Sequence, residues 1–231
     1  AMSDEACDPR VEVCFQGIGD LDGGTFFSQA WGVAHVNGET VVVGDSSSER
    51  SAASQGILPH TEACKYSGGP GDARIRRILD MEPPLANSSA TDVALVGTQT
   101  YFTGRTSLGA IRAIQEANEL VVPVTLLFSI EQFNTFVPVS GHSISDNGEI
   151  VVGTGQRSGN VDLRRAFLST RALGFEFVPF LNPSNTGNVF TFGNGVSPNG
   201  SYAVGRDNSS ANGASFGFVY PSPEFANVIC I

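Results

Sequence analysis

Charged side chains and a single tryptophan stand in loops and at predicted strand ends along the chain. The set consists of Asp20, Asp22, Trp31, Asp45, Arg50, Arg105, Arg157, Arg206 and Asp207. Carboxylates, guanidinium groups and an aromatic ring are what a site for a sugar or an acidic partner would need, if the fold gathers them on one face. We predict such a ligand or partner face. The alternative is a set of solvated loops in which the Asp residues only form turns.

The sequence signals for catalysis and for metal binding are weaker than those for the partner face. Asp20 and Asp22 offer oxygen ligands of the kind that calcium prefers. The three histidines (His35, His60 and His142) are scattered, and the chain has no nucleophile elbow, P-loop or HExxH motif. We therefore expect no catalytic residues and no cofactor other than calcium. Two carboxylates that hydrolyse glycosides would not be visible here, because a sequence does not give the separation of their carboxyl groups.

The composition excludes several classes of partner. Of the 231 residues only 16% are charged, and the net charge is −10, whereas about 25% charged residues is usual. An acidic chain lacks the basic face that nucleic-acid phosphates require, so we expect no nucleic-acid partner. The longest apolar run, residues 120–128, is too short for a membrane-spanning helix. We therefore expect no transmembrane segment.

Other features of the composition indicate an exported protein. The chain has a single lysine and four scattered cysteines without a CxxC pair. It begins with Ala rather than Met, so either an export signal was removed or Ala1 is a remnant of cloning. An even number of such cysteines is typical of disulfides in an oxidising compartment. We expect an extracellular, periplasmic or cell-surface location. There Asn87, Asn199 and Asn208 stand in glycosylation sequons.

A repeated pattern shows which elements would position the charged residues. A small apolar segment, a turn with glycine and a β-branched run ending in glycine recur at residues 33–44, 93–104, 144–153 and 196–205. The turn glycines are separated by 59, 51 and 52 residues. Asn-Gly favours the positive φ angles of a tight hairpin turn, and β-branched residues favour strands. Each copy therefore predicts a β-hairpin.

Further apolar segments follow each hairpin. Third strands are predicted at residues 62–66, 165–169 and 215–220, and fourth strands at 74–79, 133–139, 175–181 and 225–231. Residues 108–119 are ambiguous between a short helix and a strand that turns at Asn118 into residues 121–128. We favour the strand. Residues 11–20 resemble one more closing strand, at the N-terminus.

Units of about fifty residues with four strands are typical of propeller blades. We predict a single all-β domain, residues 1–231, with units at about 11–82, 83–139, 140–182 and 183–231. The architecture would be a β-propeller-like repeat of four or five small blades, and a β-sandwich is the alternative. Cys14 and Cys230 hold similar places in the first and last closing segments. We therefore predict a Cys14–Cys230 disulfide that locks the ring and a second one between Cys7 and Cys64.

Residues 18–46 also carry a family resemblance. The stretch Gly-Asp-Leu-Asp-Gly-Gly at 19–24, followed by Ser-Gln-Ala-Trp-Gly-Val at 28–33 and Val-Val-Val-Gly at 41–44, resembles the HAF-type extracellular repeat. Glu62-Ala-Cys and Arg165-Ala-Phe stand where that repeat has its Glu-Ala-Phe segment. The match is good over the first unit, fair over the third and fourth, and poor over the second. It implies a secreted, propeller-like repeat protein without agreed catalytic activity, so no functional residues carry over.

The function that we expect is binding or structural rather than enzymatic. The chain would be a scaffold at the cell surface or a subunit of an extracellular assembly, with a protein or glycan partner and as a homo- or hetero-oligomer. The alternative is a carbohydrate-binding or glycan-active protein that uses the polar loop face.

Overall fold

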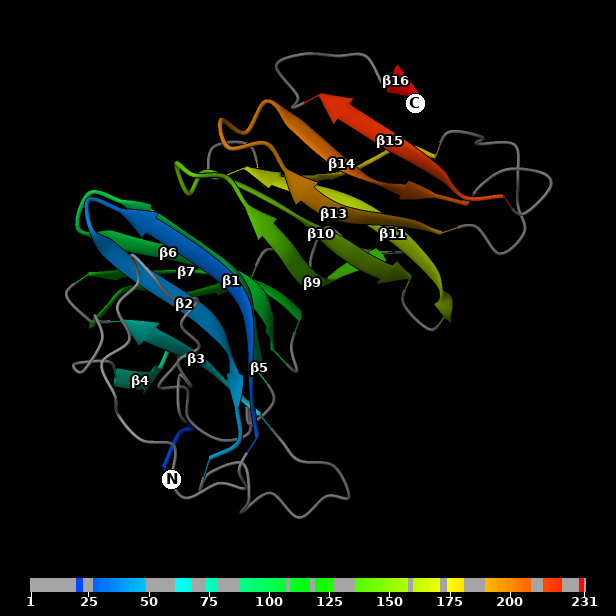
Figure 1. Cartoon of the computed structure of the whole chain (residues 1–231). Coiled ribbons are helices and arrows are strands. Elements are labelled where there is room, and N and C mark those ends of the chain that lie inside the picture. Colours follow the sequence, from blue (N-terminus) through cyan, green and yellow to red (C-terminus); the bar gives the residue numbers. More distant parts are fainter. Residues whose placement is uncertain are drawn as a thin grey trace, which may run out of the picture.

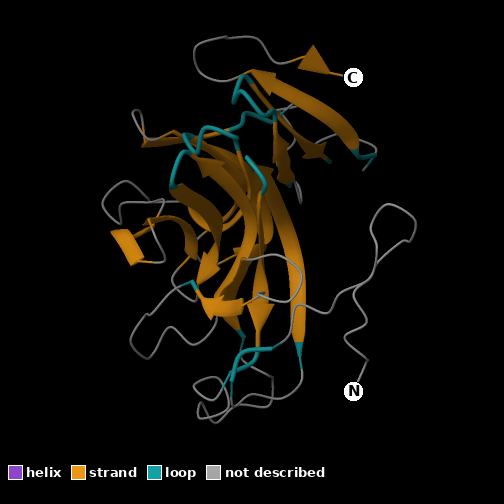
Figure 2. Cartoon of the chain, turned by 60° about the vertical axis from the view of Figure 1, so that its left-hand side comes forward, coloured by secondary structure: helices purple, strands orange, loops and turns teal. Residues whose placement is uncertain are grey.

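A computed structural model of the chain describes the β-rich part of the sequence in detail. The described residues are 20–22, 27–48, 61–67, 74–78, 88–106, 109–116, 119–126, 136–157, 160–170, 174–180, 190–208, 214–221 and 229–230. Within these ranges the protein is all-β, and Figure 2 shows strands joined by loops without any helix. The predicted fold class is confirmed at this level.

The strands form four antiparallel sheets of four strands each. Sheet 1 contains β1 (Ser28–Val36), β2 (Glu39–Ser46), β3 (Glu62–Ser67) and β4 (Arg74–Arg77). Sheet 2 contains β5 (Ser88–Val96), β6 (Gln99–Thr106), β7 (Gly109–Glu116) and β8 (Glu119–Leu126). Sheet 3 contains β9 (Phe136–Ile144), β10 (Ile150–Arg157), β11 (Asn160–Thr170) and β12 (Gly174–Phe177). Sheet 4 contains β13 (Thr191–Val196), β14 (Tyr202–Asp207), β15 (Phe216–Pro221) and β16 (Ile229–Cys230).

The four predicted hairpins are present as the first two strands of each sheet. Their turn glycines, Gly38, Gly97, Gly148 and Gly200, all have positive φ, as does Asn37 at 53°. In sheets 3 and 4 the turn is also held by a serine, since the Ser145 and Ser197 hydroxyls each accept a backbone N–H five residues on. The repeat read from the sequence therefore corresponds to a repeat of hairpins in space.

One part of the predicted strand order differs from the structure. Within the ambiguous segment 108–119, the described residues 109–116 are strand β7, as favoured, and β8 begins at residue 119 and pairs with it. Sheet 2 thus has its fourth strand by residue 126, and residues 136–139, expected to close that unit, begin β9 of sheet 3 instead. Backbone pairing explains the difference, because Phe136 and Val137 pair with Arg157 and Gln156 of β10. The predicted N-terminal closing strand lies outside the described residues, apart from Asp20.

The sheets follow one another in a row, each packed on the sheet before it. The first strands of consecutive sheets touch (β1 with β5, β5 with β9, and β9 with β13), so they lie side by side through the molecule. Figure 1 shows sheet 1 at one end of the row and sheet 4 at the other. We call the face of a sheet toward the following sheet its forward face and the opposite one its rear face.

Apolar side chains fill the space between consecutive sheets. Val41 and Val43, on the forward face of sheet 1, pack with Val93 and Phe102 on the rear face of sheet 2. The other two contacts are built alike, with Tyr101 against Ile144 and Val151 and Val152 with Ala203. Phe102, Phe167 and Phe218 are among the largest fully buried side chains. Burial of such large aromatic rings adds to the apolar contacts that hold the sheets together.

Candidate functional site

Each sheet carries a β-bulge at the same place on its first strand. The second-strand glycines Gly44, Gly104, Gly153 and Gly205 pair with Ala30, Ala90, Gly141 and Gly193, and the register then skips one residue. The skipped residues are Trp31, Thr91, His142 and Asn194, which we call the bulge row. A bulge leaves its extra residue outside the ladder and redirects its side chain. Because the first strands lie side by side, the bulge row runs across all four sheets.

Trp31 and Asp45 of sheet 1 are brought together, as part of the predicted partner face. The Trp31 indole Nε1 donates a hydrogen bond to Oδ1 of Asp45. Asp45 is buried, and the same oxygen accepts a hydrogen bond from the Ser89 hydroxyl of sheet 2 at 3.3 Å. Trp31 nevertheless keeps 57% of its surface exposed. The hydrogen bond therefore fixes the orientation of an indole ring that solvent can still reach.

Thr91 and Asp92 join sheet 2 to sheet 3. The Thr91 hydroxyl donates to the carbonyl of Gly141 at 2.8 Å. Oδ2 of Asp92 accepts hydrogen bonds from the Ser143 hydroxyl and from the backbone N–H of Ile144, both at 2.9 Å. The sequence analysis did not single out Asp92. Its signal was an Asp inside an apolar strand pattern, where this residue type is depleted.

His142 is the bulge residue of sheet 3 and lies near Arg105 of sheet 2. Burial lowers the pKa of His142, and the positive charge of Arg105 lowers it further. The imidazole therefore stays neutral at pH 7. In that form one ring nitrogen can donate a hydrogen bond and the other can accept one. Asn194, the fourth member of the row, is exposed in sheet 4.

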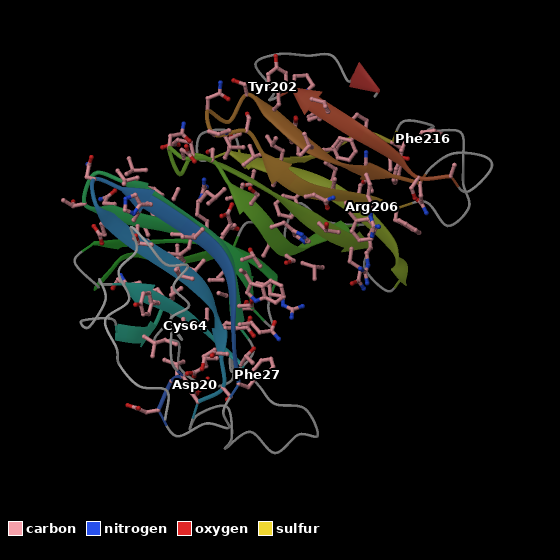
Figure 3. The ribbon with its side chains drawn as sticks, in the orientation of Figure 1. Asp20, Phe27, Cys64, Tyr202, Arg206 and Phe216 are labelled. Carbon is pink, nitrogen blue, oxygen red and sulfur yellow. The ribbon has the colours of Figure 1, made fainter. Side chains whose placement is uncertain are left out.

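Arg206 and Asp207 lie on opposite faces of sheet 4. Arg206 is exposed and its guanidinium lies over the Phe192 ring, 4.4 Å from the ring centre. Asp207 is buried. Figure 3 shows Arg206 on sheet 4, far from Asp20 and Cys64 at the other end of the row. These two neighbours in sequence thus belong to different surroundings.

The remaining residues of the predicted face do not complete one rim. Asp22 is exposed in a turn, and Arg105 is exposed on β6. Arg50 lies outside the described residues, and so does the side chain of Arg157 at the end of β10. Of the predicted set, the structure brings Trp31 and Asp45 into contact and places Arg105 beside His142. Of the others that are described, Asp20 and Asp22 lie at the sheet 1 end of the row, and Arg206 and Asp207 lie on sheet 4.

Of the two proposed calcium ligands, Asp20 is half-buried and Asp22 is exposed. One of its carboxylate oxygens is buried and has no hydrogen-bond partner in the described part of the structure. Within that part, however, no three His, Cys, Asp or Glu side chains gather as a metal ion would require. Calcium binding by Asp20 and Asp22 stays a prediction.

Cys64, on β3 of sheet 1, is a buried free thiol near Asp20. Burial raises its pKa to about 12, and the negative charges of Asp45 and Asp20 act in the same direction. Cys7 and Cys14 are outside the described residues, as is the side chain of Cys230 on β16. The Cys14–Cys230 pairing, and that of Cys64 with Cys7, stay predictions.

The sequons occupy different surroundings. Asn199 is exposed in the β13–β14 turn, where its Oδ1 accepts hydrogen bonds from Ser197 and Ser201. Oδ1 of Asn208 accepts the backbone N–H of Phe190 at 2.6 Å. Asn87 lies outside the described residues. Asn199 is thus the more accessible of the two described sites.

Comparison with known proteins adds no family to this description. No family model matches the chain, and no curated protein matches it. The HAF-type resemblance therefore stays a prediction. The described residues also include no helix that is long and apolar enough to cross a membrane.

Proposed function

We propose that this chain is an exported, propeller-like β-repeat protein whose role is to bind partners, as a cell-surface scaffold or as a subunit of an extracellular assembly. Each sheet is a simple meander of four consecutive strands, which is the design of a propeller blade. Successive sheets stack through their first strands, as blades do around an axis.

The observation that carries the proposal is the contrast between the middle of the row and its ends. Val43 and Val93 are buried where sheets 1 and 2 meet, and Val152 is buried where sheets 3 and 4 meet. Val33 on the rear face of sheet 1 and Val204 on the forward face of sheet 4, at the matching positions, are exposed. Exposed apolar patches of this kind mark protein interaction sites. They favour a protein that functions in a larger assembly.

Localisation and complex size test this proposal together. An antibody against the protein would be used on intact cells of the source, on their medium and on their lysate, and each fraction would be sized on a density gradient. We expect the signal outside the cytoplasm, in particles larger than one chain. A protein found only in the cytoplasm as a single chain would rule the proposal out.

Trp31 favours a second candidate function, which is carbohydrate binding. An exposed aromatic ring can stack on the apolar face of a sugar, and the hydrogen bond to Asp45 holds this ring in place. Since the chain has one tryptophan, its fluorescence reports directly on this site.

A glycan array followed by fluorescence titration tests the sugar-binding function. We expect a glycan that binds to shift the emission, and Trp31→Ala to lose binding on the array while Tyr202→Ala, an exposed aromatic on sheet 4, retains it. A screen with glycoside substrates run in parallel separates binding from hydrolysis. An array without hits, or hits that survive Trp31→Ala, would refute a sugar site here.

A further inference from the structure

The forward face of sheet 4 has the same construction as the forward faces that are covered inside the molecule. Counting from the second-strand glycine, Val204 corresponds to Val43, Thr103 and Val152 of sheets 1 to 3. Those three side chains are 1%, 0% and 0% exposed, whereas Val204 is 43% exposed. Tyr202 is 45% exposed, while its counterparts Val41 and Tyr101 are 0% and 6% exposed. Sheet 4 thus presents half of a sheet-to-sheet contact.

The rear face of sheet 1 presents the other half along its first strand, β1, while the same face is buried on β3 at Cys64 and Tyr66. Val33 corresponds to Val93 of sheet 2 and Ile144 of sheet 3, which are each 5% exposed because they pack on the preceding sheet. Val33 is 64% exposed. Ala30 is also exposed, although its counterparts Ala90, Gly141 and Gly193 are buried. Figure 1 shows these two open faces at opposite ends of the row.

The internal contacts show how close the two faces must come. A Cβ added at Gly141 would lie 1.9 Å from Oγ1 of Thr103, and one added at Gly193 would lie 2.6 Å from Cγ1 of Val152. At both places a small residue of one sheet lies directly on the forward face of the sheet before it. The sheet 1–sheet 2 contact has Ala90 at this position, buried in one cluster with Val43. Ala30 repeats the side chain of Ala90, and Val204 holds the place of Val43.

The polar edge of the contact is also complementary. Asp45 of sheet 1 accepts a hydrogen bond from Ser89 of sheet 2. The corresponding residues at the open ends are Arg206, which is exposed, and Gln29. A guanidinium can donate to the amide oxygen of Gln, so the exchange of acceptor and donor preserves a hydrogen bond.

We propose that the open forward face of sheet 4 binds the open rear face of sheet 1 of a second copy of this chain. The contact repeats the internal packing and joins copies head to tail, as a ring or a filament according to the rotation per copy. This inference rests on the proposed function and names the partner for the exposed faces.

Sedimentation velocity of the purified full-length protein over a range of concentrations tests the proposal. We expect the wild type to form species larger than one chain as concentration rises. Val33→Asp and Val204→Asp should each weaken self-association at least tenfold, so that single chains predominate where the wild type associates. The reason is that a carboxylate would be desolvated at the contact. Both valines are exposed, so each variant should keep the wild-type circular dichroism and melting temperature. Val96→Asp, a change at an exposed valine of a middle sheet, should associate like the wild type.

A mixture of the two variants gives the sharper result. Val33→Asp retains an intact sheet 4, and Val204→Asp retains an intact sheet 1, so equal amounts should form a one-to-one dimer and nothing larger. Self-association that persists in Val33→Asp alone would mean that sheet 4 faces pair with each other, and would overturn the proposal.

A wild type that stays a single chain at every concentration would also overturn the proposal. If both valine variants then melt at lower temperature, the two faces close on each other within one chain. If they do not, the faces take a different protein. In that case the role in an extracellular assembly stands, because its test depends on location and complex size in the source cells.

Discussion

The contacts on the two sides of sheet 2 use the same backbone positions with different chemistry. The residue after the bulge is Gly32 in sheet 1 and Asp92 in sheet 2. Toward sheet 1, the contact depends on close approach, because a Cβ on Gly32 would lie only 2.7 Å from Cα of Asp92. Toward sheet 3, it depends on the Asp92 carboxylate, which binds Ser143 and Ile144.

The difference shows that the four sheets share the position of the bulge but differ in the side chain that follows it. The bulge sets how near two first strands can lie, and the next residue either leaves that space empty or fills it with a group that binds the neighbour. Sheet 4 has Gly195 at this position, and a Cβ there would meet only Cγ2 of Val204 at 3.4 Å. Sheet 4, at the end of the row, therefore has room for an added methyl group at this position, whereas sheet 1 has none where it packs on sheet 2.

The largest effect is expected from removing the Asp92 carboxylate. Asp92→Ala leaves the backbone N–H of Ile144 and the Ser143 hydroxyl without their acceptor. Loss of hydrogen bonds to a charged group between packed sheets should lower the free energy of unfolding by about 3 kcal/mol. Urea unfolding followed by circular dichroism measures this.

Glu39→Ala is the control for the loss of a negative charge, because Glu39 is exposed at the hairpin end of β2. It should change stability by less than about 0.5 kcal/mol. Equal effects of the two substitutions would show that net charge, and not the sheet 2–sheet 3 contact, is what Asp92 controls.

The next largest effect is expected at Gly32. Gly32→Ala places a methyl group against the backbone of Asp92 and forces sheets 1 and 2 apart, which should cost about 2 kcal/mol as overpacking does elsewhere. Gly195→Ala makes the same change at the matching position of sheet 4 and should be close to neutral. The difference between the two melting temperatures measures the middle-to-end contrast directly. A Gly195→Ala variant as unstable as Gly32→Ala would mean that sheet 4 is covered in solution.

The hairpins and the strand character of the fold followed from the sequence because local signals determine them. Turn glycines, preceded by Asn in three of the four copies, and β-branched runs act over a few residues, and all four hairpins were found from them. The unit boundary near residue 139 was misplaced because strand pairing is not local. Residues 136–139 look like any apolar segment until β10 is there to pair with them.

The site followed from the sequence only in part, for a related reason. Trp31 and Asp45 were selected as residue types, and they do meet, yet nothing in the sequence showed that Asp45 is buried between two sheets. Arg206 and Asp207 were assigned to a loop after Gly205, yet both belong to strand β14, where alternation places adjacent residues on opposite faces. The bulge row could not be predicted, since a bulge is a property of two paired strands.

A smaller effect is expected from pH, through His142 at the sheet 2–sheet 3 contact. Its pKa is lower in the folded protein than in the unfolded chain. As pH falls below about 6.5 the unfolded chain binds a proton that the folded protein does not, so stability present at pH 7 is lost. His142→Gln should therefore flatten the stability curve between about pH 7 and pH 5.

Arg105→Gln provides the matched test of the cause. Removing the neighbouring positive charge should raise the pKa of His142 toward its ordinary value, which an NMR titration of the imidazole C–H signals measures. An unchanged His142 titration in that variant would leave burial as the only cause.

The last prediction concerns the reactivity of the Cys64 thiol. It compares a buried and an exposed position on the same face of sheet 1. Cys64 shares the rear face of sheet 1 with Val33, yet it is buried while Val33 is exposed. A thiol with a pKa of about 12 has a thiolate fraction of only about one in ten thousand at pH 8. Iodoacetamide should therefore leave Cys64 unlabelled in the folded protein and label it after unfolding without reductant, as peptide mass spectrometry can show. Labelling only after reduction would instead show that Cys64 is in a disulfide, whose partner, Cys7 by our prediction, is identified by non-reduced peptide mapping. Rapid labelling of the folded protein would mean that the rear face of sheet 1 is open at Cys64 as well as at Val33.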